Sequence, residues 1–325
     1  MHKVDRAQNM TSWDLVYHML RANFDGVRSE YCRVPEPLEE DGPVVHLHGH
    51  TVKGAVVKGD KVEVMWKSAK GKEGSTLADF VVAADGPSST IRDSLIPTVN
   101  RMYAGYCALR GTVPESDLSV STREAFCERF TFFHAQGIQV LAYLIPGESG
   151  ALEPGKRLIN FVYYTNFPAK SLDEPSPELA ELMTDVHGVQ HRISMPPGKI
   201  DLKAWEKQLQ IAKKILPPPF VELVSVTKKP FVQAITDVLS PENELMGGKV
   251  VLVGDALAGF RPHTAASTSQ AAFDAMILAD MIAGKVSREE WKRKTMEYAR
   301  TVQKRGVEMG DRSQFEKLPP ERYFG

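Results

Sequence analysis

Two acidic residues follow apolar runs that predict buried strands, and each stands beside a glycine. Asp85 and Gly86 follow the run 81–84, and Gly254 and Asp255 follow the run 249–253. An ionised carboxylate only accepts hydrogen bonds, so at the C-terminal edge of a sheet it suits a sugar or ribityl hydroxyl. The competing interpretation is that each Asp only caps the following helix or turn. Two such junctions in one chain favour nucleotide or flavin binding.

The segment after the second junction predicts a helix over 264–282 with almost no bulk in its first turns. These turns read Thr-Ala-Ala-Ser-Thr-Ser-Gln-Ala-Ala. Small side chains leave room for a planar ligand, and the free N–H groups of a helix N-terminus favour negative charge. The alternative is tight packing of the helix on a sheet, which also selects Ala and Ser.

The elements that must position these residues change character along the chain. A helix over 11–23, capped by Thr11 or Ser12, comes first. Strands follow over 44–57 and 61–66, joined by a turn at 58–60, and over 78–84, which we expect to be buried on both faces. The middle predicts strands and then helices, and the end returns to α/β order. Its expected elements are strands 130–133, 139–145 and 157–164, helices 177–187 and 201–216, strand 249–253, helix 264–282 and a helix beginning at Ser287.

The two junctions resemble the motifs of a known family. Ala84-Asp85-Gly86 with Ile91-Arg92, and Gly254-Asp255-Ala256 with the run Arg-Pro-His-Thr-Ala-Ala over 261–266, resemble the DG and GD motifs of the class A FAD-dependent aromatic-ring monooxygenases. The Arg-Pro-His-Thr-Ala form, with Thr-Ser-Trp-Asp-Leu at 11–15, is similar to the 2,6-dihydroxypyridine 3-monooxygenase branch. The resemblance covers about 11–310.

The resemblance implies roles for individual residues. Asp255, next to Gly254, would accept a hydrogen bond from a ribityl hydroxyl, and Asp85 with Gly86 would lie near the cofactor and help with NAD(P)H. Pro262 would face the flavin where the oxygen adduct forms, which makes it a catalytic candidate. Backbone contacts to the isoalloxazine would come from His263, Thr264, Ala265 and Ala266, and the helix that carries Arg21 would flank the cofactor.

The reaction that the resemblance implies is aromatic hydroxylation. NAD(P)H would reduce non-covalently bound FAD, and a flavin C4a-hydroperoxide formed with O2 would hydroxylate a small hydroxylated aromatic or N-heteroaromatic ring. A flavin dehydrogenase without oxygen chemistry is a weaker alternative.

The family's glycine fingerprint has no match in this chain. The sequence contains no Gly-x-Gly at all, whereas the fingerprint places the FAD pyrophosphate on a helix N-terminus. We therefore expect an N-terminally truncated FAD domain. The alternatives are a fragment, a shortened non-catalytic paralogue that cannot hold FAD alone, and a homodimer or partner chain that supplies the missing half.

The predicted fold is α/β. It comprises an incomplete, three-layer, Rossmann-like FAD-binding domain over 1–102 and 236–325. Inserted into it, over 103–235, is an α+β substrate-binding domain built on a largely antiparallel sheet.

The composition of the chain excludes several other classes. The 325 residues include 40 Lys and Arg against 41 Asp and Glu, a net charge of −1, which gives no reason to expect nucleic acid or a membrane as partner. Three scattered cysteines argue against a disulfide scaffold or a zinc site. With no apolar run of membrane-spanning length, we expect a cytoplasmic protein.

Further candidates come from the histidines and aromatic residues. His46, His48 and His50 would share one face of the strand over 44–57, but no fourth ligand is evident, so we predict no metal site. Aromatic residues at 132, 133, 143, 163 and 164 could line a substrate pocket, although core packing is their commoner role. His134 among them is the candidate for acid–base catalysis.

Overall fold

A computed structural model describes residues 11–39 and 41–315 of the chain. The chain divides into two compact units. The first comprises the described residues of 1–46, 105–234 and 313–325, and the second comprises 47–104 and 235–312. Two of the four boundaries between the units fall inside strands, namely β5 (Met102–Pro114) and β10 (Phe231–Leu239). The predicted boundaries at 102/103 and 235/236 lie close to them, and the functional division into two domains stays a prediction.

The first unit is built on an antiparallel sheet, as predicted for the middle of the chain. The strands β6 (Phe130–Ala135), β7 (Ile138–Ile145), β8 (Leu158–Asn166) and β5 are neighbours in that order, and β10 follows β5. The short strand β9 (Ser194–Met195) pairs with β10. Strands β5 and β10 were not foreseen.

One face of this sheet forms the core of the first unit. Gly111 and its cross-strand partner Phe161 lie on that face, and a Cβ on Gly111 would collide with Phe161 and with Thr227. Phe126 and Phe220 bring two covering helices together with ring centroids 4.9 Å apart. The helices of this region are α3 (Val120–Phe126), α4 (Pro177–Leu182), α5 (Leu202–Ile215) and α6 (Pro218–Ser225). Helix α5 ends close to the predicted 216, and the proline run at 217–219 separates it from α6 and begins that helix.

The first helix, α1 (Trp13–Asp25), begins after the predicted cap residue Ser12 and ends two residues beyond the predicted 23. The Ser12 hydroxyl accepts a hydrogen bond from the Leu15 N–H at 3.2 Å. Gly26 closes the helix in the left-handed region, with φ of 67°.

The second unit contains a hairpin sheet and a smaller mixed sheet. Strands β1 (His50–Lys58), β2 (Lys61–Ser68) and β3 (Glu73–Ala78) are antiparallel, and the predicted turn between β1 and β2 is confirmed. In the mixed sheet, β12 (Val250–Leu252) pairs antiparallel with β11 (Glu244–Leu245) and parallel with β4 (Val81–Ala83). The two-residue strand β13 (Ala258–Gly259) pairs with the end of β10.

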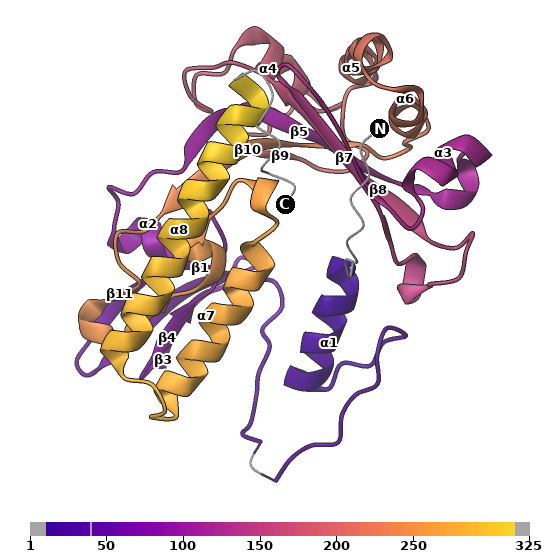
Figure 1. The fold of residues 1–325 in the computed structure, drawn as a ribbon. Helices are drawn as coiled ribbons and strands as arrows, with labels where there is room; N and C mark the ends of the chain where they lie inside the picture. Colours follow the sequence, from indigo (N-terminus) through magenta and orange to yellow (C-terminus); the bar gives the residue numbers. More distant parts are fainter. Residues whose placement is uncertain (1–10, 40, 316–325) are drawn as a thin grey trace. The chain divides into compact units, whose positions relative to one another are not determined.

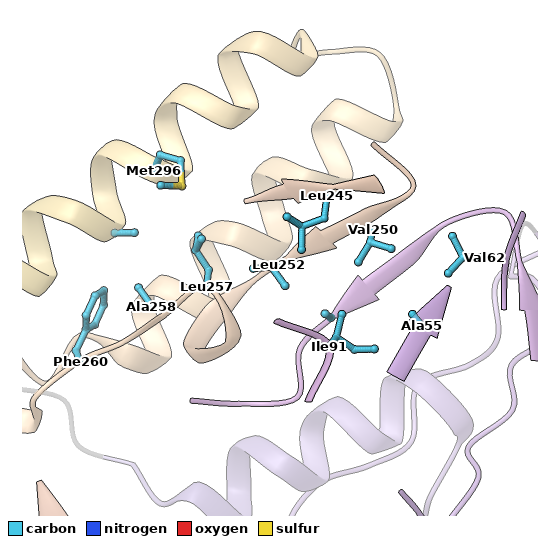
Figure 2. Packing of buried hydrophobic residues seen from close by; sticks show 12 residues of the cluster. Ala55, Val62, Ile91, Leu245, Val250, Leu252, Leu257, Ala258, Phe260 and Met296 are labelled. Carbon is cyan, nitrogen blue, oxygen red and sulfur yellow. The ribbon is translucent and has the colours of Figure 1, made fainter. Parts of the chain in front are cut away.

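Apolar residues from distant segments form the core beneath the mixed sheet (Figure 2). Val250 and Leu252 of β12 share this cluster with Ile91, which lies on the short helix α2 (Thr90–Leu95). Leu257 and Phe260 fix the segment that follows β12 to the same core.

Two long helices run side by side in the second unit (Figure 1). They are α7 (Ser267–Ile282) and α8 (Arg288–Phe315). Phe273 and Tyr298 stack between them at 5.1 Å, and the buried Trp291 packs against Ile277. The Ser287 hydroxyl accepts from the Glu290 N–H, which confirms the predicted start of α8.

Four sequence predictions were wrong in detail. The helix expected over 177–187 ends at Leu182. The strand expected over 44–57 begins only at His50, so His46 and His48 do not share a strand face with it. The strand expected over 78–84 is split between β3 and β4, and Val82 is 44% exposed rather than buried. Helix α7 begins at Ser267 rather than Thr264, because Ala265 is in the left-handed region with φ of 50°.

Within the described ranges, no helix combines the length and apolar character needed to cross a bilayer. Nor do three potential metal-ligating side chains gather anywhere in those ranges.

Candidate functional site

The parallel strands β4 and β12 bring the two acidic junctions together. Val81 pairs with Val250 and Ala83 with Leu252, and the Val253 N–H donates to the Ala83 carbonyl at 3.1 Å. The carboxyl ends of parallel strands meet at one sheet edge, which is where open α/β sheets bind ligands. The turns after Ala83 and Val253 therefore lie next to each other, as their sequence pattern predicts.

A buried arginine ties the two turns together. Arg92 lies on α2 and its side chain is only 1% exposed. Its Nη1 donates to the Ala256 carbonyl at 3.0 Å, and its Nη2 donates to the Pro87 carbonyl at 2.9 Å. The guanidinium thus fixes the backbone after Asp85 against the backbone after Asp255.

Asp85 uses both of its oxygens within its own turn. Oδ1 accepts from the Ser89 hydroxyl at 2.5 Å, and Oδ2 accepts from the Ile91 N–H at 3.2 Å. These contacts cap the start of α2. The neighbouring Gly86 has φ of 82°, and a Cβ there would meet nothing within 4 Å.

Asp255 is placed differently at the end of the parallel strand. Its Oδ1 is buried and has no hydrogen-bond partner among the described residues. Burial raises the pKa of Asp255, while a hydrogen bond from Ser267 and the positive charge of Arg101 oppose that rise. A buried acceptor without a donor is costly, and a ligand hydroxyl would supply the donor.

Two side chains of α7 hold the peptide group of Gly254. Gln270 Nε2 donates to the Gly254 carbonyl at 2.8 Å, and Asp274 Oδ2 accepts from the Gly254 N–H at 2.8 Å. Both side chains belong to residues that are fully buried. Gly254 has φ of 56°, which a non-glycine residue adopts only with strain. Gln270 and Asp274 therefore form a clamp, the Gly254 clamp, that sets the direction of Asp255.

Burial raises the pKa of Asp274 to about 6, and the hydrogen bonds from Gly254 and Gln270 limit the rise. The protonation state of this carboxyl therefore changes within an experimentally accessible pH range.

An ion-pair network fixes the far end of the same segment. Arg261 Nε donates to Asp237 Oδ2 and Nη1 donates to Asp311 Oδ1, both at 2.6 Å. Pro262 and His263 follow in a 3-10 turn over Pro262–Thr264. Thr264 Oγ1 is a second buried atom without a hydrogen-bond partner among the described residues. Ala265 and Ala266 complete the approach to α7.

The residues of this segment fit a polyhydroxylated cofactor such as FAD. Asp255 Oδ1 and Thr264 Oγ1 offer unused acceptors, and the space around Gly86 would admit a ligand. Asp255 would hold a ribityl hydroxyl, with the Gly254 clamp and Arg261 keeping the segment in place.

The remaining two predicted site residues belong to the first unit. Arg21 donates to Asp25 at 2.6 Å and to the Tyr17 hydroxyl at 2.7 Å, all within α1. His134 lies on β6, and burial lowers its pKa, so its imidazole is neutral at pH 7. The nine others (Asp85, Gly86, Gly254, Asp255, Pro262, His263, Thr264, Ala265 and Ala266) belong to the second unit.

The residues that support the site were not predicted from the sequence. Gln270 and Asp274 are four residues apart on a helix, a spacing that puts both on one face. This spacing was the sequence signal from which the pair could have been found. Arg92 and Arg261 stood inside the quoted motifs without a role. Their partners are backbone carbonyls and distant carboxylates, which no local pattern reveals.

Known proteins share this fold. A family model described as FAD binding domain-like matches residues 103–237. The structure of 2,6-dihydroxypyridine-3-hydroxylase from Arthrobacter nicotinovorans superposes with a TM-score of 0.73 at 26% identity, over 83% of this chain and 65% of that one. Klebsiella pneumoniae HpxO, solved with FAD and uric acid, shares the fold at 20% identity and a TM-score of 0.57, over 82% of this chain and 59% of that one.

The chain is similar to class A FAD-dependent aromatic hydroxylases. Among these, it is similar to the 2,6-dihydroxypyridine 3-monooxygenase of Paenarthrobacter nicotinovorans, with 27% identity over 97% of this chain and 73% of that protein. The chain spans less than two thirds of each of the two solved structures named above.

Proposed function

We propose that the protein is an FAD- and NAD(P)H-dependent monooxygenase that hydroxylates a small hydroxylated aromatic or N-heteroaromatic ring. The observation that carries the proposal is the buried, unused acceptor Oδ1 of Asp255, held at the end of a parallel strand by the Gly254 clamp. The similarity of the chain to proteins that bind FAD suggests the identity of the cofactor. When bound, FAD would be the group that NAD(P)H reduces and that activates O2.

In this proposal, the side chains of the second unit bind the cofactor and orient it. Asp255 accepts a hydrogen bond from a ribityl hydroxyl, and Thr264 offers a second oxygen. Arg261, fixed by Asp237 and Asp311, holds Pro262 in the segment that would face the flavin. Asp85 stabilises the neighbouring turn and does not itself bind the ribityl chain. The parallel β4–β12 pair is then part of the three-layer FAD domain expected from the sequence.

The side chains of the first unit would act on the substrate. The neutral His134 is the candidate proton acceptor for a ring hydroxyl, since a neutral imidazole can take up a proton at pH 7. The antiparallel sheet that carries His134 would supply the substrate-binding surface.

The visible absorbance of the purified chain, before and after addition of FAD and desalting, tests the proposal. We expect the spectrum of bound oxidised flavin in the wild type and in Asp280→Asn, a control with a surface carboxylate on the same helix α7. We expect its loss in Asp255→Ala. A chain that stays colourless with added FAD contradicts the proposal and supports the non-catalytic alternative.

The reaction itself requires a second measurement. Consumption of NAD(P)H with formation of a hydroxylated ring supports a monooxygenase. Release of peroxide from every substrate tested, with no hydroxylated product, supports the flavin dehydrogenase alternative instead.

A further inference from the structure

Arg110 is a half-buried cation whose contacts are all neutral. It lies on β5, and its Nη1 donates to the Gln233 amide oxygen at 3.0 Å. Its guanidinium carbon lies 5.4 Å from the centroid of the Phe231 ring. Among the described residues no carboxylate lies within ion-pair distance of Arg110, and its Nε is buried without a hydrogen-bond partner there.

Three other partly buried arginines of the described chain are balanced by carboxylates. Arg157 pairs with Glu115 at 2.9 Å, Arg21 with Asp25 at 2.6 Å, and Arg261 with Asp237 at 2.6 Å. Withdrawing a guanidinium from water costs free energy unless an opposite charge or a full set of acceptors repays it. Arg110 therefore has an uncompensated positive charge that an anion would neutralise.

The strand register gathers further donors on the face that carries Arg110. Thr112, two residues along β5, pairs with Asn160, and Asn160 pairs with Tyr143 on the next strand. Asn160 is 8% exposed, and its Nδ2 lacks a hydrogen-bond partner among the described residues. Burial raises the pKa of Tyr143, while the positive charge of Arg110 lowers it. The phenol thus lies within the electrostatic reach of the guanidinium.

Aromatic rings border these donors on the same face. Phe130 stacks on Tyr143 with centroids 5.2 Å apart, and Phe132 lies 4.6 Å from Phe130. Phe132 is 37% exposed, whereas the opposite face of the sheet is the core around Gly111. A cation and a buried amide donor beside an accessible aromatic surface suit a ligand that is both flat and anionic.

We propose that Arg110 and Asn160 bind the anionic oxygen, carboxylate or phenolate, of a small aromatic substrate on this face of the sheet. The proposal rests on the proposed function in one respect, because it takes the bound aromatic anion to be the molecule that is hydroxylated. Gln233 orients the guanidinium, and the Phe130–Tyr143 stack contacts the ring.

Fluorine NMR of the full chain tests this with matched probes. The carboxylate arm compares 4-fluorobenzoate with the neutral 4-fluorobenzamide, and the phenolate arm compares pentafluorophenolate with the neutral pentafluoroaniline. We expect at least one anion to bind about tenfold more tightly than its neutral match, as expected for charge-assisted hydrogen bonds. We expect Arg110→Gln to remove that preference. Arg129, an exposed arginine of the same unit, provides the control Arg129→Gln, which should retain the preference.

The proposal is overturned if neither anion is preferred in the wild type, or if the preference survives in Arg110→Gln. Thermal unfolding separates binding from a structural role. Because the substitution removes an uncompensated charge, the unfolding midpoint of Arg110→Gln should stay level or rise. If the midpoint falls instead, the variant Arg110→Lys, which keeps the charge, provides the test. Retained preference for the anion in this variant supports the proposal. Equal binding of the anion and the neutral probe overturns it.

Flavin binding is measured separately in each variant. A wild-type chain that prefers the anion but takes up no FAD would contradict the proposed function and leave the anion site standing. A chain that takes up FAD but shows no anion preference would contradict the anion site and leave the proposed function standing.

Discussion

Asp85 and Asp255 end neighbouring parallel strands and share the same sequence pattern, yet the structure uses them in different ways. Both oxygens of Asp85 accept hydrogen bonds from its own turn, from the Ser89 hydroxyl and the Ile91 N–H. Asp255 keeps one buried oxygen without a partner among the described residues. The difference lies in the distance from each turn to the next helix. The helix after Asp85 begins within six residues and consumes its acceptors, whereas α7 begins twelve residues after Asp255.

This difference shows that an acidic residue at a strand end indicates a ligand only when its hydrogen bonds are not already made. The capping interpretation therefore describes Asp85, whereas Asp255 keeps the acceptor on which our proposal of ligand binding rests. Arg92 connects the two roles, since it binds carbonyl groups of both turns. Substitution of each aspartate in turn should separate the two roles.

The largest effect is expected for Asp255→Ala. Loss of a hydrogen bond to a charged group costs about 1.5–3 kcal/mol, so the affinity for FAD should fall by about tenfold to a hundredfold. Titration of the chain with FAD, followed by the quenching of flavin fluorescence, measures this.

The stability of the same variant provides its check. Because Asp255 Oδ1 makes no bond in the described structure, Asp255→Ala removes only the hydrogen bond from Ser267, and the free energy of unfolding without FAD should fall by about 1 kcal/mol at most. Unaltered flavin affinity together with a loss of stability would assign Asp255 a structural role.

The second prediction concerns the Gly254 clamp. Asp274→Ala leaves the buried Gly254 N–H without its acceptor, which costs about 1–3 kcal/mol of unfolding free energy. The turn that carries Asp255 should also lose its fixed direction, so flavin affinity should fall as well. Chemical denaturation and the FAD titration together measure both effects.

Asp274→Asn is the matched control because an amide oxygen can still accept from Gly254. It should retain most of both properties. If Asp274→Asn were as damaging as Asp274→Ala, the clamp would not act through this hydrogen bond.

The contrast between the two turns also shows how far the sequence alone predicts the site. The apolar runs and adjacent glycines predicted both strand ends, because burial and turn geometry are local properties. The pattern could not reveal that Ser89 and Ile91 saturate Asp85, since that depends on the exact start of α2. Nor could it reveal that Ala265 delays α7, because a left-handed alanine is stabilised by its surroundings rather than by its own preference.

The same limit applies to the strands. Strands β6, β7 and β8 were found because each is a run of aromatic and β-branched residues. Strands β5 and β10 contain small and polar residues such as Gly111 and Gln233, whose partners lie far away in the chain. The positions of Arg110 and Arg92 depend on such distant pairing and could not be predicted.

The third prediction is a pH dependence that originates in the Gly254 clamp. Burial raises the pKa of Asp274 from 3.8 to about 6, so between these values the folded chain binds more protons than the unfolded chain. The free energy of unfolding contributed by Asp274 therefore falls as pH rises from about 4 to 6, by at most about 1.4 kcal/mol per pH unit. Above that range the contribution is constant.

The difference in unfolding free energy between wild type and Asp274→Asn isolates this contribution. The groups that contact the carboxyl are the Gly254 amide and Gln270, and the adjacent residues of α7, Ile277 and Leu278, are apolar. Glu115 and Asp185, whose pKa values are lowered to about 2 by Arg157 and His191, act at lower pH and cancel in the difference. A difference that does not vary between pH 4 and 7 would contradict the raised pKa.

The smallest effect is expected for Asp85→Asn. An amide oxygen can still accept from the Ile91 N–H, but the charge at the start of α2 is lost, which costs about 0.5–1 kcal/mol of unfolding free energy. Flavin affinity should change less than about twofold, because both Asp85 oxygens already have partners in the protein. A loss of flavin affinity as large as that of Asp255→Ala would mean that Asp85 exchanges its internal hydrogen bonds for a ligand, and the two turns would then be equivalent after all.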